Sequence, residues 1–305
     1  MLTPPSGGGK LPRLPPDDAW AFRLQGFRLI HALRANRRIH PLSKQTSAPT
    51  TAFCSARVDG PGGFHLWIDG NGKITAANGS LDAPMPNAFS LQQIADCPGS
   101  TPTCRNSCYV HSLEKHAPAT YGLYAHNSGE IRKILDDSDI FLAVAWANHL
   151  GQWIAEHCQG GFRWHVSGDV FSAEYAAWIA AVCVSSPSVR HWIYTRSFGC
   201  LNALADARNL TVNLSCDRDN FAEAVAAAHV YGLRLCYLTV DGEVPAQVGP
   251  VDTIFPDYTL RGDTEWFNGL AAHQKKAVCP VDFHGKSETR RCGPCSRCID
   301  RSVRG

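Results

Sequence analysis

Between residues 162 and 255 the chain alternates short β-rich runs with helical patterns. Strands are predicted at 162–167, 189–195, 210–215, 233–240 and 251–255, and helices at 172–184, 201–207 and 220–231. Strand, helix and strand in succession form a parallel pair with a right-handed crossover. With a further strand at 88–94, the pattern predicts about six parallel strands, fewer than the eight of a closed barrel. We therefore expect an α/β fold built on a partial (β/α) barrel.

Four segments are predicted along the 305 residues. Residues 1–16 are rich in Gly and Pro and predict a disordered tail. Residues 17–60 predict a basic amphipathic helix, at about 19–38, and a linker. Residues 61–270 contain a hairpin, with strands at 64–68 and 73–77, and then the partial barrel. Residues 271–305 form a cysteine-rich tail with little room for a core of its own.

Seven of the thirteen cysteines fall into two compact groups. The first group, Cys97, Cys104 and Cys108, lies in a loop rich in Gly, Pro, Ser and Thr, whose turns can bring the thiols together. Three thiolates are one short of a structural zinc site, but they suffice for a 4Fe-4S cluster with one open iron. Two alternatives stay open: zinc with a fourth ligand such as His111 or His116, and three free thiols.

The second group offers four thiols, Cys279, Cys292, Cys295 and Cys298. An all-cysteine zinc site and a fully ligated iron–sulfur cluster both fit this number. Consecutive two-residue spacers resemble ferredoxin-type runs more than zinc ribbons, which favours iron–sulfur. The surrounding lysines and arginines either offset the charge of this site or contact nucleic acid.

A third set of polar residues follows the predicted parallel strands. It comprises Ser167, Gly168, Asp169, Arg196 and Asp217. Loops at the carboxyl ends of parallel strands gather at one rim, where ligands bind. We expect Gly168 to let a ligand approach the backbone, Asp169 to accept from an amine or hydroxyl, and Arg196 to clamp a carboxylate or phosphate. The structural alternative is that the carboxylates cap helices and pair with Arg196.

These motifs resemble the phage "gene product 88" family over roughly residues 89–298. The resemblance is carried by the motif Cys-Pro-x5-Cys-x3-Cys-Tyr at 97–109, Ser167-Gly168-Asp169, Tyr194-Thr195-Arg196, Leu214-Ser215 and the terminal cysteine run. It implies a cysteine-rich metalloprotein encoded by phages and prophages rather than a particular reaction.

The same layout is similar to that of radical S-adenosylmethionine enzymes. In those enzymes a three-cysteine loop after the first strand holds a 4Fe-4S cluster, and the open iron binds the amine and carboxylate of S-adenosylmethionine. The resemblance implies that residues 167–169 contact that amine and that the C-terminal cysteines hold an auxiliary cluster. The spacing differs, because six and three residues separate the cysteines here instead of the usual three and two.

Composition limits the partners and the cellular compartment that we expect. The net charge of +2 gives no global signal for nucleic acid or membrane. The odd cysteine total and the lack of a signal peptide argue for a reducing cytoplasm, that of the host cell if the protein is phage-encoded. No apolar run reaches the roughly 18 residues that span a bilayer.

We therefore predict an iron–sulfur, radical-S-adenosylmethionine-like enzyme that takes a small-molecule ligand. The alternatives are a metal-stabilised protein that binds nucleic acid through the basic arginine face of helix 19–38, and an iron–sulfur electron carrier or sensor. A solvated helix docked on the main domain is the simpler interpretation of that arginine face.

Overall fold

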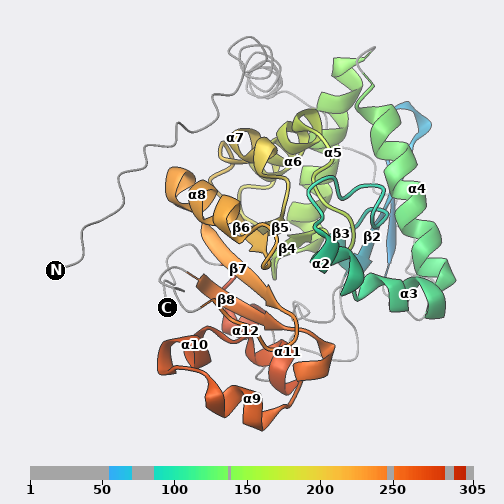
Figure 1. The fold of residues 1–305 in the computed structure, drawn as a ribbon. Helices are drawn as coiled ribbons and strands as arrows, with labels where there is room; N and C mark the ends of the chain where they lie inside the picture. Colours follow the sequence, from blue (N-terminus) through green and yellow to red (C-terminus); the bar gives the residue numbers. More distant parts are fainter. Residues whose placement is uncertain (1–54, 71–85, 137–138, 246–250, 286–291, 300–305) are drawn as a thin grey trace.

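The computed structural model describes residues 55–70, 86–136, 139–245, 251–285 and 292–299 (Figure 1). The tail predicted at 1–16, the basic helix at 19–38 and the strand at 73–77 lie outside these residues. No described helix combines the length and the apolar character that crossing a bilayer requires.

Eight strands in the described part of the chain form one sheet, and each strand lies beside its neighbours in sequence. They are β1 (Ala56–Asp59), β2 (His65–Gly70), β3 (Pro86–Phe89), β4 (Phe162–Trp164), β5 (His191–Thr195), β6 (Leu210–Cys216), β7 (Arg234–Thr239) and β8 (Val251–Pro256). β1, β2 and β3 pair antiparallel, and β3 to β8 pair parallel. The predicted α/β class and the parallel run of strands are confirmed.

The described strands pair in the order β1 to β8, and no pairing joins β8 to β1. The strands that the structure describes therefore form an open, mostly parallel sheet. One isolated parallel bridge extends the β8 edge, from Ile254 to Val278. The strand pairing establishes a mixed α/β fold. It does not by itself establish the predicted partial barrel, because sequential strand order alone does not make a barrel.

The helices connect and cover the strands. They are α2 (Pro102–Asn106), α3 (Val110–His116), α4 (Pro118–Ile134), α5 (Ile140–His157), α6 (Ala173–Ser185), α7 (Leu201–Leu204), α8 (Phe221–Tyr231), α9 (Thr264–Gly269), α10 (Ala272–Ala277), α11 (Pro280–His284) and α12 (Cys292–Cys295). Ser172, where the predicted helix at 172–184 begins, is the N-cap of α6, because its hydroxyl accepts from the Tyr175 N–H at 3.2 Å. Asp139 caps α5 in the same way, accepting from the Leu142 N–H at 3.1 Å.

One face of the sheet is apolar and packs on helices. Trp164, Ile193 and Val212 share this face through their register, and all three belong to the main buried core. Trp164 meets Trp178 of α6 edge to face, with ring centroids 6.2 Å apart. Burial of large side chains on both layers supplies most of the stabilisation of such a fold.

The opposite face is polar and is covered by the end of the chain. Tyr194 and Asn213 lie opposite each other in register on this face. Thr211, two residues before Asn213 on β6, donates to the Ile299 carbonyl at 2.8 Å, and Asn213 donates to the Cys298 carbonyl at 3.0 Å. Figure 1 shows α9 to α12 gathered below β7 and β8, away from α5 to α8. The C-terminal tail therefore docks on the sheet instead of forming a separate body.

The described residues contain a hairpin that was not predicted, whereas the predicted partner strand at 73–77 lies outside them. β2 continues through Gly70 and pairs with β1, and a 3₁₀ turn at Pro61–Gly63 joins the two strands. β1 lies in the segment predicted as linker. Val58 is the only buried residue of the four in β1. A strand this short, with one buried side chain, shows too little alternation of apolar and polar residues to be predicted from the sequence.

Candidate functional site

The first cysteine loop begins where β3 ends and is fixed to the loop after β6. The Thr101 hydroxyl accepts from the Cys104 N–H at 2.9 Å, which caps α2, and it donates to the Asp217 carboxylate at 2.6 Å. The Thr103 N–H donates to Asp219 at 2.9 Å. Two carboxylates from another part of the chain thus position the turn that carries Cys104.

The three thiols of this loop are half-buried and influence one another. Burial raises the pKa of Cys97 to about 12, and the nearby charge of Asp169 and the thiols of Cys104 and Cys108 act in the same direction. The Cys108 thiol donates to the Gln93 side-chain oxygen at 3.2 Å. Without a cation, burial and the neighbouring negative charge favour the protonated form of the Cys97 thiol.

The thiols can be compared with the ligands around a single zinc ion. Four thiolates on a zinc ion lie roughly 3.8 Å apart, because each Zn–S bond is about 2.3 Å. Among the described residues, the sets of three ligand atoms that lie within 4.8 Å of one another include no cysteine. In neither group, therefore, do three described thiols lie within 4.8 Å of one another.

The two histidines considered as a fourth ligand make other contacts. His111 Nδ1 lies 3.0 Å from the Gln93 amide nitrogen, and its Nε2 lies 3.0 Å from the Arg105 carbonyl. Both ring nitrogens of His111 are thus engaged. His116 Nδ1 lies 2.8 Å from the Ser112 carbonyl within its own helix.

Asp169, Arg196 and Asp217 come together beside the cysteine loop, at the carboxyl ends of β4, β5 and β6. Asp169 accepts from the Arg196 N–H at 2.8 Å and from the Val170 N–H at 2.7 Å, and burial raises its pKa. The Arg196 guanidinium pairs with Asp217 at 3.2 Å, with both side chains buried. The Asp217–Arg196 pair is the structural arrangement considered as the alternative to ligand binding.

Two glycines bring backbones close together at this rim. Gly168 has a φ of +79°, and a Cβ there would lie 2.6 Å from the Leu91 Cβ. A Cβ on Gly99 would lie 2.3 Å from the Arg196 carbonyl oxygen. The close approach at Gly168 is to Leu91, and the cysteine loop lies directly against Arg196.

Three buried polar atoms in the same loops have no hydrogen-bond partner in the described structure. They are the hydroxyls of Ser167 and Ser197 and Nη1 of Arg196. Buried polar atoms are normally paired, so these three are the atoms of the rim with hydrogen-bonding capacity left over. Ser167 and Arg196 were predicted site residues, whereas Ser197 was not singled out.

The second cysteine group packs on the polar face of the sheet. Cys298 lies 3.7 Å from the Thr253 hydroxyl, and Cys292 packs against the cluster of Trp192 and Ile299. Cys279 follows α10, and its N–H donates to the Ile254 carbonyl at 2.8 Å. The tail thus meets the sheet at β5 and at β8.

Cys236 is the residue that sequence reasoning missed. It is fully buried on β7, opposite Thr253 in register, and its thiol is hydrogen-bonded to Cys298. This contact, followed by hydrogen bonds from Tyr194 and Thr253, lowers the pKa of Cys298. The alternation of side chains along a strand places Cys236 on the same face of β7 as Arg234. The sequence gives no signal that Cys298 of the tail packs against this face.

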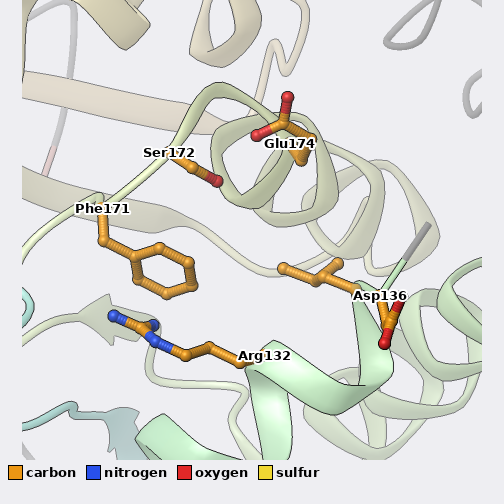
Figure 2. Close-up of a pocket in the computed structure, with 6 residues that line it drawn as sticks. Arg132, Asp136, Phe171, Ser172 and Glu174 are labelled. Atoms are coloured by element: carbon orange, nitrogen blue, oxygen red, sulfur yellow. The ribbon is translucent and has the colours of Figure 1, made fainter.

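A surface cavity of about 290 Å³ lies between the end of α4 and the start of α6 (Figure 2). The Arg132 guanidinium lies 4.0 Å from the centre of the Phe171 ring and pairs with Asp96, the residue before Cys97. The lining residues are Arg132, Leu135, Asp136, Phe171, Ser172 and Glu174, none of which was predicted as a site residue.

Comparison with known protein families gives one match. The family model for gene product 88 matches residues 65–301. The chain belongs to the gene product 88 family. The match starts at β2 and runs through the last described cysteine, so both cysteine groups and the rim residues lie in the part that the gene product 88 model covers. No curated protein and no solved structure matches the chain.

Proposed function

We propose that the protein is an iron–sulfur protein with a radical-S-adenosylmethionine-like layout. In this proposal Cys97, Cys104 and Cys108 hold a 4Fe-4S cluster with one open iron. The observation that carries the proposal is the position of this three-thiol loop, at the carboxyl end of β3 and against the Arg196 backbone. Ligands of parallel α/β sheets bind at this edge.

The strand order supports the finer fold assignment in this proposal. β3 to β8 are six parallel strands in sequential order, the order of a (β/α) barrel that stops short of closure. The polar face, with Arg163, Tyr194 and Asn213, would then be the inner surface of a partial barrel, because its helices pack on the other face.

The donor set fits a cluster. The three thiols do not all lie within 4.8 Å of one another, and His111 has both nitrogens engaged. The raised pKa of Cys97 means that a thiolate at this position needs a cation beside it. A positively charged iron core would offset the charges of Asp169 and of the neighbouring thiols.

The rim residues would orient the ligand. When bound, a cluster with an open iron supplies an electron and a coordination site for an amine and a carboxylate. The Nη1 of Arg196 and the hydroxyls of Ser167 and Ser197 are the polar atoms available to donate to such a carboxylate or to a hydroxyl. Asp169 and Asp217 would position Arg196, one through its backbone and the other through its guanidinium.

The C-terminal cysteines would hold a second metal centre that fastens the tail to the sheet. Cys279, Cys292, Cys295 and Cys298 are the predicted ligands, with zinc as the alternative to a cluster. Cys236 adds a fifth thiol beside Cys298 and is a candidate to replace one of the four.

The test is anaerobic purification followed by iron analysis, absorbance and electron paramagnetic resonance of the reduced protein. We expect a brown protein with about 4 to 8 iron atoms per chain, and a spectrum that changes when S-adenosylmethionine is added. Cys104→Ser should lose one cluster and the spectral change on adding S-adenosylmethionine. Cys200→Ser, at a half-buried cysteine outside both groups, should keep the cluster and the spectral change.

Two other outcomes of this test would each favour a different function. A colourless protein with about two zinc ions would contradict the proposal and favour a metal-stabilised binding protein. An iron–sulfur spectrum that S-adenosylmethionine leaves unchanged would remove the radical chemistry and leave an electron carrier or sensor.

A further inference from the structure

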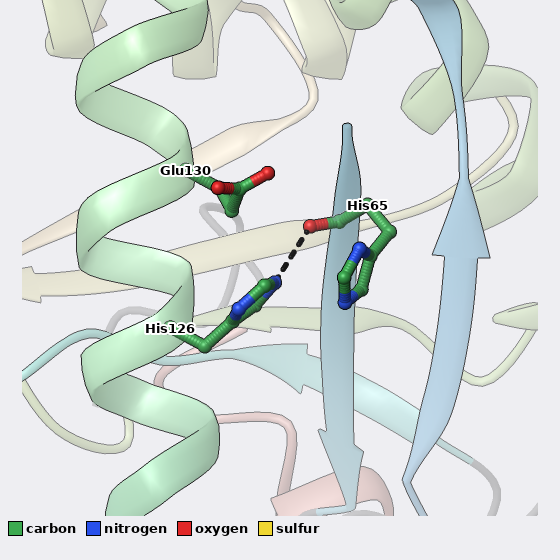
Figure 3. Close-up of side chains that lie close together, drawn as sticks. All are labelled: His65, His126 and Glu130. Carbon is green, nitrogen blue, oxygen red and sulfur yellow. Dashed lines mark hydrogen bonds between the residues drawn. The ribbon is translucent and has the colours of Figure 1, made fainter. Parts of the chain in front are cut away.

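A separate set of metal-binding side chains joins the start of β2 to α4 (Figure 3). It consists of His65 on β2 and of His126 and Glu130, which lie one turn apart on α4. One ligand atom from each residue lies within 4.8 Å of the other two, and all three residues are half-buried. Within the described residues, this is the one set of three ligand atoms gathered so closely.

The hydrogen bonding of His126 prepares it for a metal. Its Nε2 lies 3.1 Å from the His65 carbonyl oxygen, which can only accept a hydrogen bond. The proton must therefore be on Nε2, which leaves the lone pair on Nδ1. Histidines that bind metals commonly donate their other ring N–H to a backbone carbonyl in this way.

His65 lies directly beside His126. The two imidazole rings are stacked, with centroids 4.2 Å apart and planes 29° apart. The packing of α4 on β2 therefore brings both rings to one place.

Glu130 supplies the negative charge. Its carboxylate accepts from the His65 backbone N–H and pairs with the Lys133 ammonium at 2.8 Å. The Lys133 side chain is 62% exposed, so this ion pair contributes little and gives way readily to a cation.

We propose that His65, His126 and Glu130 form a binding site for one divalent zinc ion that fastens β2 to α4. Two imidazoles and one carboxylate are a ligand set that zinc accepts, with a water molecule in the fourth position. This inference is independent of the function proposed for the cysteines, because it uses none of them.

The test uses the full-length protein, purified with its cysteine sites loaded, and Zn²⁺ as the probe. The ring nitrogens of ¹⁵N-labelled histidines are followed by NMR as Zn²⁺ is added. We expect the signals of two histidines to shift and to saturate at one equivalent, and single substitutions assign them to His65 and His126. The thermal midpoint of wild-type protein should rise with Zn²⁺.

Variants separate this site from zinc bound elsewhere. His126→Ala should bind one equivalent fewer by equilibrium dialysis and lose the thermal shift, and Glu130→Gln should weaken binding about tenfold. His149→Ala is the matched control, because His149 is a half-buried helical histidine that also lies near a backbone carbonyl, 2.7 Å from that of Asp59. Equal zinc binding by wild type and His126→Ala, or unmoved His65 and His126 signals in the wild type, would overturn the proposal.

Discussion

The two cysteine groups lie on different parts of the same sheet and are held in different ways. Cys97, Cys104 and Cys108 belong to one short loop at the rim, and that loop is anchored by Thr101 and Asp217. The C-terminal cysteines reach the polar face only because the tail packs there, through contacts that are spread over β5 to β8.

The difference teaches how each centre depends on the rest of the fold. The rim group is organised by local turns and by one buried ion pair, so its geometry should persist when the tail is loosened. The face group exists only in the docked tail, so metal binding and docking should stabilise each other. Four predictions sharpen or break this comparison.

The largest effect should come from removing the metal. Treating the protein with a chelator should make amide hydrogen exchange in residues 292–299 at least about tenfold faster, because the docked tail loses the metal that we propose fastens it to the sheet. The loop around Thr101 should change much less, since protein groups anchor it. Hydrogen exchange followed by mass spectrometry measures both segments in one experiment, and equal changes in the two would break the comparison.

Breaking the buried ion pair at the rim should come next. Asp217→Asn leaves the Arg196 charge buried and unpaired, which should lower the free energy of unfolding by about 3 to 5 kcal/mol in urea denaturation. The control is Asp219→Asn, at an exposed carboxylate that bonds the Thr103 N–H of the same loop. A similar loss in both variants would show that the ion pair is not the main anchor.

A buried carboxylate outside both cysteine groups should respond to pH and give a reference for effects that do not depend on either group. Burial raises the pKa of Asp69 on β2 to about 7, and the carboxylate accepts from Ser90 at 3.0 Å and from Tyr124 at 3.3 Å. Because the folded state favours the protonated form, this contribution to stability is present below about pH 4 and is lost as the pH rises to about 7.

Asp69→Asn should remove that dependence. Relative to wild type, the variant should gain about 2 to 4 kcal/mol of unfolding free energy between pH 4 and pH 8. Urea denaturation at both pH values measures the difference. A constant difference between the two proteins across this range would contradict the raised pKa.

The smallest effect should come from a single contact of the tail. Thr211→Val keeps the side-chain shape but loses the hydrogen bond to the Ile299 carbonyl, which should cost about 1 kcal/mol. Urea denaturation would detect the loss, and faster metal release from the C-terminal centre should accompany it. A loss as large as that of Asp217→Asn would mean that the tail depends on one contact rather than on many.

Much of the scaffold follows from local sequence patterns. The alternation between 162 and 255 predicted the parallel strands, and Ser172 marked the start of α6 correctly. These features are encoded over a few neighbouring residues, as strand periodicity and as a capping hydroxyl. The predicted residues Asp169, Arg196 and Asp217 did meet at one rim, because parallel strands bring their carboxyl ends together.

Other features depend on contacts between distant parts of the chain. Gly168 was expected to admit a ligand, and its close neighbour is Leu91. Cys236 looks like an ordinary buried cysteine in the sequence, yet it lies against Cys298. His65 and His126 are separated by sixty residues and meet because α4 packs on β2.

The sequence by itself determined the class of fold, the order of the parallel strands and the two cysteine groups that suggest metal chemistry. Local periodicity and short motif spacing carry that information. Only the tertiary structure decided which carboxylate pairs with Arg196, which face of the sheet the tail covers and which histidines lie together. Those outcomes follow from how whole elements pack, and the energy of packing is set by partners far apart in the chain.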